Sequence, residues 1–327
     1  MPKTKHFPKF KAGLPDVTGR VFVITGTTSG TGYVAARTVA ELGGEAVLLN
    51  RASKRVDAMM TSLQQEVPDG TFVPLECDLQ SFESVRNAAA EIKRRYDRIY
   101  CLSNNAGIMA TPDEATVDGY DTQMQTNHLS HFLLTAELLP LLEAEADAIG
   151  DARIVSHSSL GRLYTPNDTL EQRYFERNGG NLGGNDIGLM KGACFYRYFQ
   201  TKLANSVFTY GLSEKLKAKG SKVRAVCAHP GGSDTRLADD MKLGFFMTTM
   251  MKAIAPLMMQ TAEDGAMGLL LGMMSPDAES GVLYGPKKSG TKGLAVPNPP
   301  KPFETDPQSI EMLWRTSEAA TGTQLLS

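Results

Sequence analysis

Residues 21–37, VFVITGTTSGTGYVAAR, decide the fold of this chain. The apolar run over 21–25 indicates a buried strand, and the residues from Tyr33 onward favour a helix. Glycines in the turn between them let the backbone bend tightly and approach a pyrophosphate, whose charge the helix N-terminus favours. This strand–turn–helix context predicts dinucleotide binding. The expected contacts are Gly26, Thr28, Ser29, Gly30, Thr31 and Gly32.

Short apolar runs alternate with helical patterns along the rest of the chain, which is typical of a parallel sheet wrapped by helices. We expect strands at about 20–25, 45–50, 71–77, 99–104, 152–158, 222–229 and 282–284. We expect helices at about 30–42, 53–67, 81–96, 118–145, 196–219 and 261–274. The pattern predicts a single α/β domain over 18–327, with a Rossmann-like doubly wound sheet of about seven mainly parallel strands.

The third predicted strand contains a proline, Pro74. Proline cannot donate a hydrogen bond to a neighbouring strand, so a strand that contains it should lie at the edge of a sheet. In the doubly wound order 3-2-1-4-5-6, the third strand is an edge. The two arguments agree.

The composition is that of an ordinary globular protein, with 42% hydrophobic and 21% charged residues in 327. A net charge of −2 gives no reason to expect a nucleic acid or an anionic membrane as partner. No apolar run reaches the ~18 residues of a membrane span, and Met1–His6 lacks the apolar core of a secretory signal.

His128 and His131 have no cysteine or histidine cluster near them, so no metal is expected. Scattered cysteines predict reduced, buried thiols in a cytoplasmic protein: Cys77, Cys101, Cys194 and Cys227.

Three segments depart from the alternating pattern. Residues 1–17 carry four lysines and no acid before Asp16, and they predict a flexible arm, with a partner-binding segment as the alternative. Residues 164–195 are rich in glycine and asparagine and predict a long surface insertion, a loop with a short helix. Residues 236–260 are rich in methionine and phenylalanine. They fit either core or a mobile apolar lid over a lipophilic substrate.

The end of the second strand indicates which nicotinamide cofactor binds. An NAD enzyme typically has an acid here for the ribose 2′-hydroxyl. This chain has Asn50 followed by Arg51. A neutral residue followed by a guanidinium suits a 2′-phosphate, so NADP(H) is expected in preference to NAD(H). The alternative for Arg51 is a solvated residue at a helix start.

Other strand ends supply further candidate cofactor contacts. Asp78, with Leu79 beside it, follows the third strand and is positioned to touch the adenine, although Asp78 could equally cap the next helix. Ligands of such folds bind beyond the carboxyl ends of the strands. By this argument, the candidates after the fourth and sixth strands are Asn105, Ala106, Gly107, Pro230, Gly231 and Thr235.

A tyrosine and a lysine one helical turn apart form the candidate acid–base pair, Tyr198 and Lys202. A free tyrosine titrates near pH ~10. A lysine about 4 Å away would stabilise the phenolate by up to ~4 kcal/mol at an effective dielectric of ~20, about three pKa units. Such a shift would make the phenol an effective general acid or base. Tyr196 is no candidate, because the residue four positions later is a glutamine.

Together these motifs resemble the short-chain dehydrogenase/reductase superfamily over about residues 18–290. The resemblance rests on residues 25–32 with their Gly-x-x-x-Gly-x-Gly spacing, residues 104–107, Asn127, Ser159, the Tyr198/Lys202 pair and residues 230–235. Within the superfamily, the chain looks like the branch that holds retinol dehydrogenases, the WW-domain oxidoreductase and light-dependent protochlorophyllide reductases. The runs NHLSHF at 127–132 and KLAN at 202–205 are typical of that branch, as is the enlarged gap between Ser159 and Tyr198.

The resemblance implies a role for each catalytic candidate. Tyr198 gives a proton to a carbonyl oxygen or takes it from an alcohol. Lys202 lowers the pKa of Tyr198 and bonds the nicotinamide ribose. Ser159, chosen over Ser158 by alignment alone, holds the substrate oxygen, and Asn127 anchors a water of the proton relay. Three departures from the family pattern touch cofactor fit and substrate shape without removing a catalytic group: Thr31, His157 and Gly232.

The resulting hypothesis is NADP-dependent hydride transfer between a carbonyl and an alcohol on a lipophilic small molecule. One alternative is reduction of a C=C bond, as in enone-reducing relatives. A second alternative is a binding protein that senses NADPH without turnover. Such a protein would have no need of a tyrosine with a shifted pKa. The resemblance also leaves a homodimer open, because many members pair through the helices that bear Asn127 and Tyr198, whereas members with long insertions need not.

Overall fold

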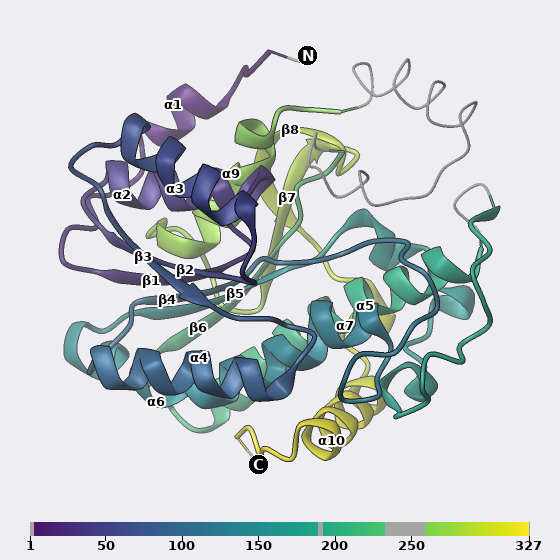
Figure 1. Cartoon of the computed structure of the whole chain (residues 1–327). Coiled ribbons are helices and arrows are strands. Elements are labelled where there is room, and N and C mark those ends of the chain that lie inside the picture. The colour runs from purple at the N-terminus through teal and green to yellow at the C-terminus, as the bar shows by residue number, and fades with distance from the viewer. Residues whose placement is uncertain (1–2, 189–191, 233–258, 327) are drawn as a thin grey trace.

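The protein, represented by a computed structural model, is described over residues 3–188, 192–232 and 259–326. An eight-stranded sheet in the order β3-β2-β1-β4-β5-β6-β7-β8 lies between two layers of helices (Figure 1). The strands are β1 Val21–Thr25, β2 Glu45–Asn50, β3 Thr71–Glu76, β4 Cys101–Asn104, β5 Ala152–His157, β6 Val223–Ala228, β7 Val282–Lys288 and β8 Lys292–Asn298. Strands β1 to β7 pair in parallel. The predicted Rossmann-like α/β class is confirmed.

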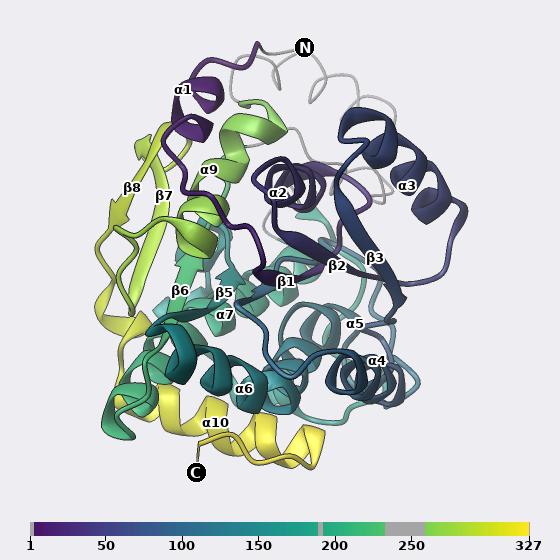
Figure 2. The same cartoon turned by 90° about the vertical axis from the view of Figure 1, so that its left-hand side faces the viewer.

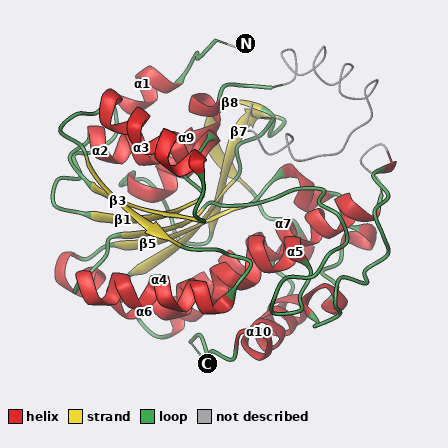
Figure 3. Ribbon diagram, in the orientation of Figure 1, coloured by secondary structure: helices red, strands yellow, loops and turns green. Residues whose placement is uncertain are grey.

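Helices cover both faces of the sheet (Figure 3). Their bounds are α1 Phe7–Lys11, α2 Gly30–Glu41, α3 Lys54–Glu66, α4 Phe82–Arg95, α5 Thr122–Met124, α6 Ser130–Ile149, α7 Ala193–Ala218, α9 Ala262–Met274 and α10 Pro307–Thr321. Helices α1, α2, α3 and α9 share one apolar core with the sheet, and α4, α6, α7 and α10 share the other. Burial on both faces explains why the central strands are continuous apolar runs rather than alternating ones.

The edge position of the third strand is confirmed. Within the described residues, strand β3 pairs with β2 alone, and Pro74 lies opposite Leu48. A proline is tolerated there because an edge strand has a partner strand on one side alone. At the other edge, β8 pairs antiparallel with β7 and was not predicted. Its sequence contains Pro297 and few buried residues, so it carries no strong strand signal.

Residues 3–17 differ from the flexible arm that the sequence suggested. Helix α1 packs its Phe7, which is 3% exposed, against the core beneath α9. The Asp264 carboxylate at the start of α9 accepts hydrogen bonds from the backbone N–H groups of Lys5, His6 and Phe7, at 2.9–3.0 Å. A carboxylate 257 residues away is a long-range partner that local composition does not reveal.

The predicted insertion at 164–195 forms short 3₁₀ turns at Pro166–Asp168 and Gln172–Phe175 within the described residues. It docks on the segment after β4, where Asp113 Oδ2 accepts the N–H groups of Leu182 and Gly184. The predicted apolar segment at 236–260 lies, except for its last two residues, outside the described residues. No helix in the described ranges is long and apolar enough to cross a membrane.

Helix α10 was also absent from the prediction. It lies below α6 in Figure 2, on the sheet face opposite α2 and α3. Its Trp314 stacks on Phe208 of α7 with ring centroids 5.4 Å apart, and contacts Phe132 of α6. Its start and end were visible in the sequence: Asp306 caps it through Ser309 N, and Gly322 ends it in the left-handed conformation.

Candidate active site

The predicted site loops all follow the carboxyl ends of parallel strands. The glycine-rich turn follows β1, and residues 105–107 follow β4, its neighbour in the sheet. The chain order reverses between these two strands, with β2 and β3 on one side and β5 and β6 on the other. That reversal is the switch point at which dinucleotides bind in such folds.

The glycine-rich turn is packed against the end of β4 so closely that side chains would not fit. Gly26 has φ +70°, and a Cβ there would lie 2.8 Å from Ala106 Cα. A Cβ on Gly32 would lie 2.2 Å from Gly26 O and 2.4 Å from Asn105 Nδ2. The helix that follows begins at Gly30, and the side chain of its N-cap, Ser29, makes no capping hydrogen bond. The turn therefore fits a pyrophosphate that approaches the backbone.

Asn50 and Arg51 behave differently. Asn50 is buried, and its side chain holds the glycine-rich turn: Oδ1 accepts Thr27 N at 2.9 Å, and Nδ2 donates to Thr27 Oγ1 at 2.7 Å. Arg51 is exposed immediately after β2. Asn50 thus positions the turn, whereas the guanidinium of Arg51 is the group open to solvent at this strand end.

Asp78 and Leu79 follow β3. Asp78 Oδ1 accepts the N–H of Gln80, and its own N–H donates to Ser84 Oγ. Helix α4 is capped instead by Ser81, which accepts Ser84 N, so Asp78 is not the cap of that helix. Leu79 is buried, and its carbonyl accepts the hydroxyl of Ser130 at 2.6 Å.

Tyr198 and Lys202 lie on one face of α7, and both are 4% exposed. Lys202 Nζ is 5.6 Å from the centre of the Tyr198 ring and donates to the backbone oxygen of His157 at 3.1 Å. That bond ties α7 to the end of β5, where the candidate serine follows.

The structure separates the two serines after β5. Ser158 is buried, and its hydroxyl donates to Lys202 O at 2.7 Å, so it faces the backbone of α7. Ser159 is half-buried, accepts Gly161 N at 3.1 Å and interacts with the phenol of Tyr198. The sequence argument chose Ser159 by alignment alone, whereas the geometry gives a physical reason for that choice.

The predicted direction of the Tyr198 pKa shift is wrong for this arrangement of side chains. Burial raises the pKa of Tyr198 to about 12, and the hydrogen bond with Ser159 offsets only part of this rise. Burial also lowers the pKa of Lys202 to about 8. The expected lowering assumed an ammonium about 4 Å from the phenol, but Lys202 reaches the His157 carbonyl instead, and loss of hydration dominates both groups.

Asn127 lies in a π-helical segment, Gln125–Leu129, between α5 and α6. Its Oδ1 accepts Ile108 N at 2.8 Å, while its Nδ2 donates to Ile108 O and to Thr201 Oγ1, both at 2.9 Å. These bonds explain an asparagine inside a helix, and single π turns of this kind are frequent at functional sites. A Cβ on Gly107 would lie 3.2 Å from Lys202 Nζ and 3.3 Å from Asn127 Oδ1, so the three candidates meet there.

The turn after β6 lies on the β8 side of the site. Gly231 has φ +66°, and a Cβ there would lie 2.3 Å from Thr291 O. The carbonyl of Pro230 accepts Gln260 Nε2 at 2.9 Å. The remaining candidate of this loop, Thr235, lies outside the described residues.

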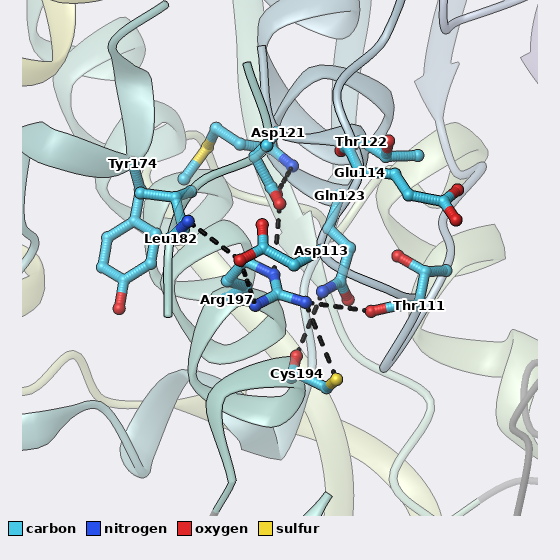
Figure 4. Close-up of polar contacts among 12 residues, drawn as sticks. Thr111, Asp113, Glu114, Asp121, Thr122, Gln123, Tyr174, Leu182, Cys194 and Arg197 are labelled. Carbon is cyan, nitrogen blue, oxygen red and sulfur yellow. Dashed lines mark hydrogen bonds and ion pairs between the residues drawn. The ribbon is translucent and has the colours of Figure 1, made fainter. Parts of the chain in front are cut away.

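Sequence reasoning missed a buried ionic cluster beside the site, drawn in Figure 4. Arg197, immediately before Tyr198, has a side chain that is 0% exposed; it pairs with Asp121 at 3.2 Å and with Asp113 at 3.8 Å. It also donates to the carbonyls of Gly184 and Thr111. Burial raises the pKa of Asp121 to about 6, and two carboxylates share one guanidinium here. The partners lie 76 and 84 positions apart in sequence, so no local signal links them.

Comparisons with known proteins identify the family of this chain. The family model for short chain dehydrogenases matches residues 20–167. An uncharacterized oxidoreductase of Schizosaccharomyces pombe is 34% identical over 274 residues, 83% of this chain and 77% of the relative. The chain belongs to the short-chain dehydrogenase/reductase family.

Two further similarities extend the likeness to most of the chain. Human polyprenol dehydrogenase is 30% identical over 85% of this chain and 79% of its own length. The crystal structure of a protein from Mycobacterium paratuberculosis superposes with a TM-score of 0.73 at 30% identity, covering 96% of this chain and 97% of that one. As a short-chain dehydrogenase/reductase of the retinol dehydrogenase-like branch, the protein is an NAD(P)-dependent oxidoreductase acting on CH–OH and C=O groups.

Proposed function

We propose that the protein uses NADP(H) to interconvert a carbonyl and an alcohol on a lipophilic small molecule, with Tyr198 as general acid and base. The observation that carries the proposal is the meeting of Tyr198, Lys202 and Ser159 beside the switch point of the sheet. Tyr198 interacts with Ser159, and Lys202 is fixed 5.6 Å from its ring by the His157 carbonyl. When NADP(H) is bound, its nicotinamide ring would supply or accept the hydride.

In the reducing direction, Tyr198 donates its phenolic proton to the substrate oxygen while the carbonyl carbon gains the hydride; oxidation reverses both transfers. The phenol is protonated at neutral pH and so has the proton to give, but burial, which raises its pKa to about 12, makes it a weaker acid than a free tyrosine. Ser159 would hold the substrate oxygen beside the phenol. Asn127 is fixed by the Ile108 backbone close to Lys202, as a relay through bound water would need.

A lipophilic substrate is supported by the apolar surroundings of the phenol. Tyr198 belongs to a cluster with Phe195 and Phe199, and Tyr164, 63% exposed, packs on Phe199 with ring centroids 5.8 Å apart. An exposed aromatic side chain at the rim of an apolar cluster favours an apolar partner. The related human enzyme is named for a polyprenol.

A preference for NADP(H) is supported by the exposed guanidinium of Arg51 and by the lack of an acid at the end of β2. A cytoplasmic, reducing environment is supported by four cysteines that are all free and buried. Burial raises the pKa of Cys77, Cys101, Cys194 and Cys227, which disfavours the reactive thiolates.

The test is turnover of retinoid, steroid, aromatic and aliphatic carbonyls with NADPH and with NADH, by wild type, Tyr198→Phe and Tyr196→Phe. We expect a lower KM for NADPH than for NADH. Removal of the proton donor should lower kcat at least ~100-fold in Tyr198→Phe, within the range of general acid catalysis. Tyr196→Phe is the matched control, two positions away on the same helix, and should retain activity.

Each alternative has its own outcome. An enone reduced to a saturated ketone, rather than to an allylic alcohol, would replace carbonyl reduction with C=C reduction. Unchanged turnover in Tyr198→Phe would overturn the proposed acid. NADPH binding without turnover of any substrate would favour the sensing protein.

A further inference from the structure

Thr31 and His157, two of the residues that depart from the family pattern, both contact one atom, the side-chain oxygen of Asn105. Thr31, in the first turn of α2, donates its hydroxyl to Asn105 Oδ1 at 2.9 Å. His157, the last residue of β5, has its Nδ1 2.8 Å from the same oxygen. The three residues are 5–8% exposed. Neither Thr31 nor His157 has a catalytic role in the proposed mechanism, so their convergence needs another explanation.

The hydrogen-bond partners fix the orientation of every group in this set. Asn105 Nδ2 donates to Thr25 O at 2.9 Å and to Gly26 O at 3.1 Å, so Oδ1 must be the acceptor. His157 therefore donates from Nδ1, and burial, which lowers its pKa to about 3, keeps the ring neutral at pH 7. Both protons and both lone pairs of the Asn105 amide are thus used.

The other side of this amide holds the cofactor turn. The carbonyls of Thr25 and Gly26 begin the glycine-rich loop. Gly32 also lies against the amide, because a Cβ there would approach Asn105 Nδ2 to 2.4 Å. A loop already held in its bound shape loses less conformational freedom when a ligand binds, and so binds more tightly.

We propose that Thr31 and His157 are positioning residues that brace Asn105, and through it hold the glycine-rich turn in the shape that binds the nicotinamide dinucleotide. The proposal rests on the cofactor binding in the proposed function. It assigns His157 two separate contacts: its imidazole braces the turn, while its backbone carbonyl holds Lys202. Replacing the side chain removes the first contact and retains the second.

The experiment measures the Kd for NADPH by titration calorimetry, together with the unfolding temperature without nucleotide, for Thr31→Val and His157→Leu. We expect each variant to raise Kd about tenfold, the effect of one lost buried hydrogen bond. For His157→Leu, turnover at saturating NADPH should stay within about threefold of wild type, because Lys202 keeps its backbone partner. The effect should thus appear in Kd and in the KM for NADPH rather than in kcat.

Conservative and control variants separate bracing from general damage to the core. Thr31→Ser keeps the hydroxyl and His157→Asn offers an amide N–H near the position of Nδ1, so both should restore wild-type Kd. Thr38→Val removes another buried hydroxyl of α2, one that donates to Val34 O, and should leave Kd unchanged. Because both residues hold one oxygen, the double variant should lose less affinity than the product of the single losses.

Unchanged Kd in Thr31→Val and His157→Leu would overturn the brace while leaving the proposed function intact. Equal losses in Thr38→Val, or no recovery in Thr31→Ser and His157→Asn, would also overturn it. Wild-type protein that binds neither NADPH nor NADH would instead overturn the proposed function itself, and the brace with it.

Discussion

At the scale of single residues, the site depends on charged groups that are removed from water. Lys202 is the clearest case, because the residue is 4% exposed and no carboxylate pairs with its ammonium among the described residues. Only carbonyl and ring contacts compensate, from His157 O and the face of Tyr198. An enzyme site commonly retains such a group at a cost to stability.

We therefore expect Lys202→Met to stabilise the fold at pH 7 while lowering activity. Burial lowers the Lys202 pKa from 10.5 to about 8, which corresponds to about 3 kcal/mol. Between these pH values the unfolded chain binds more protons than the folded one, so the stability from this group rises with pH and is lost as pH falls to about 8. The gain in Lys202→Met should be largest below about pH 8 and vanish near pH 10.5.

Urea denaturation at several pH values measures this effect, with the exposed Lys217→Met on the same helix as control. The control should change stability by less than ~0.5 kcal/mol at every pH. A Lys202→Met variant destabilised at pH 7 would show that hydrogen bonding outweighs the cost of burying the ammonium.

At the scale of elements, side chains distant in sequence decide how helices begin and where they dock. Asp121 caps α5 by accepting Met124 N, and the same carboxylate pairs with Arg197 of α7. The π-segment that carries Asn127 follows directly. Helix α7 and the segment with Asn127 are thus joined at a buried ion pair as well as through Thr201. Asp264 of α9 likewise holds the start of α1, because its carboxylate accepts hydrogen bonds from three backbone N–H groups there.

Asp264→Ala should release α1 from α9. Three buried or half-buried N–H groups lose their acceptor, and we expect a loss of about 2–3 kcal/mol because the freed segment can hydrate. Amide hydrogen exchange at residues 5–11 and tryptic cleavage after Lys9 and Lys11 should both accelerate. The exposed Asp277, just beyond the same helix, offers the control variant Asp277→Ala, which should leave both unchanged. Unaltered exchange in Asp264→Ala would mean that Phe7 packing alone holds α1.

At the scale of the whole molecule, α10 closes the core on the side of α6 and α7. Trp314 is 4% exposed, stacks on Phe208 and donates its indole N–H to Leu325 O at 2.8 Å. Helix α10 thus lies over the helices through which many family members pair. A homodimer using those faces would have to displace it.

Trp314→Ala should lower the free energy of unfolding by about 3–5 kcal/mol, as expected for removing a buried aromatic side chain. Urea denaturation measures the change, and Leu294→Ala, at a residue 49% exposed, should cost far less. Gel filtration of the wild type gives its oligomeric state, and hydrogen exchange shows which helices are protected. A dimer in which α6 and α7 are protected while α10 exchanges freely would contradict the position of α10 over these helices.

Much of the fold, and the candidate residues of the site, can be predicted from local sequence patterns. The positions of strands β1 to β7 along the chain, the proline that marks β3 as an edge strand, the glycine-rich turn and the Tyr198/Lys202 pair all depend on spacing within a few residues. Periodicity and turn chemistry report such local features well. The caps of α10 at Asp306 and Gly322 belong to the same class and were readable in principle.

Only the tertiary structure decided which groups meet. It turned Ser158 toward the backbone of α7, raised rather than lowered the pKa of Tyr198, and brought Thr31 and His157 to one oxygen of Asn105. These outcomes depend on burial and on contacts between residues tens to hundreds of positions apart. Spacing along the chain determines which side chains share an element, whereas hydration and hydrogen-bond partners are fixed only once the elements pack together.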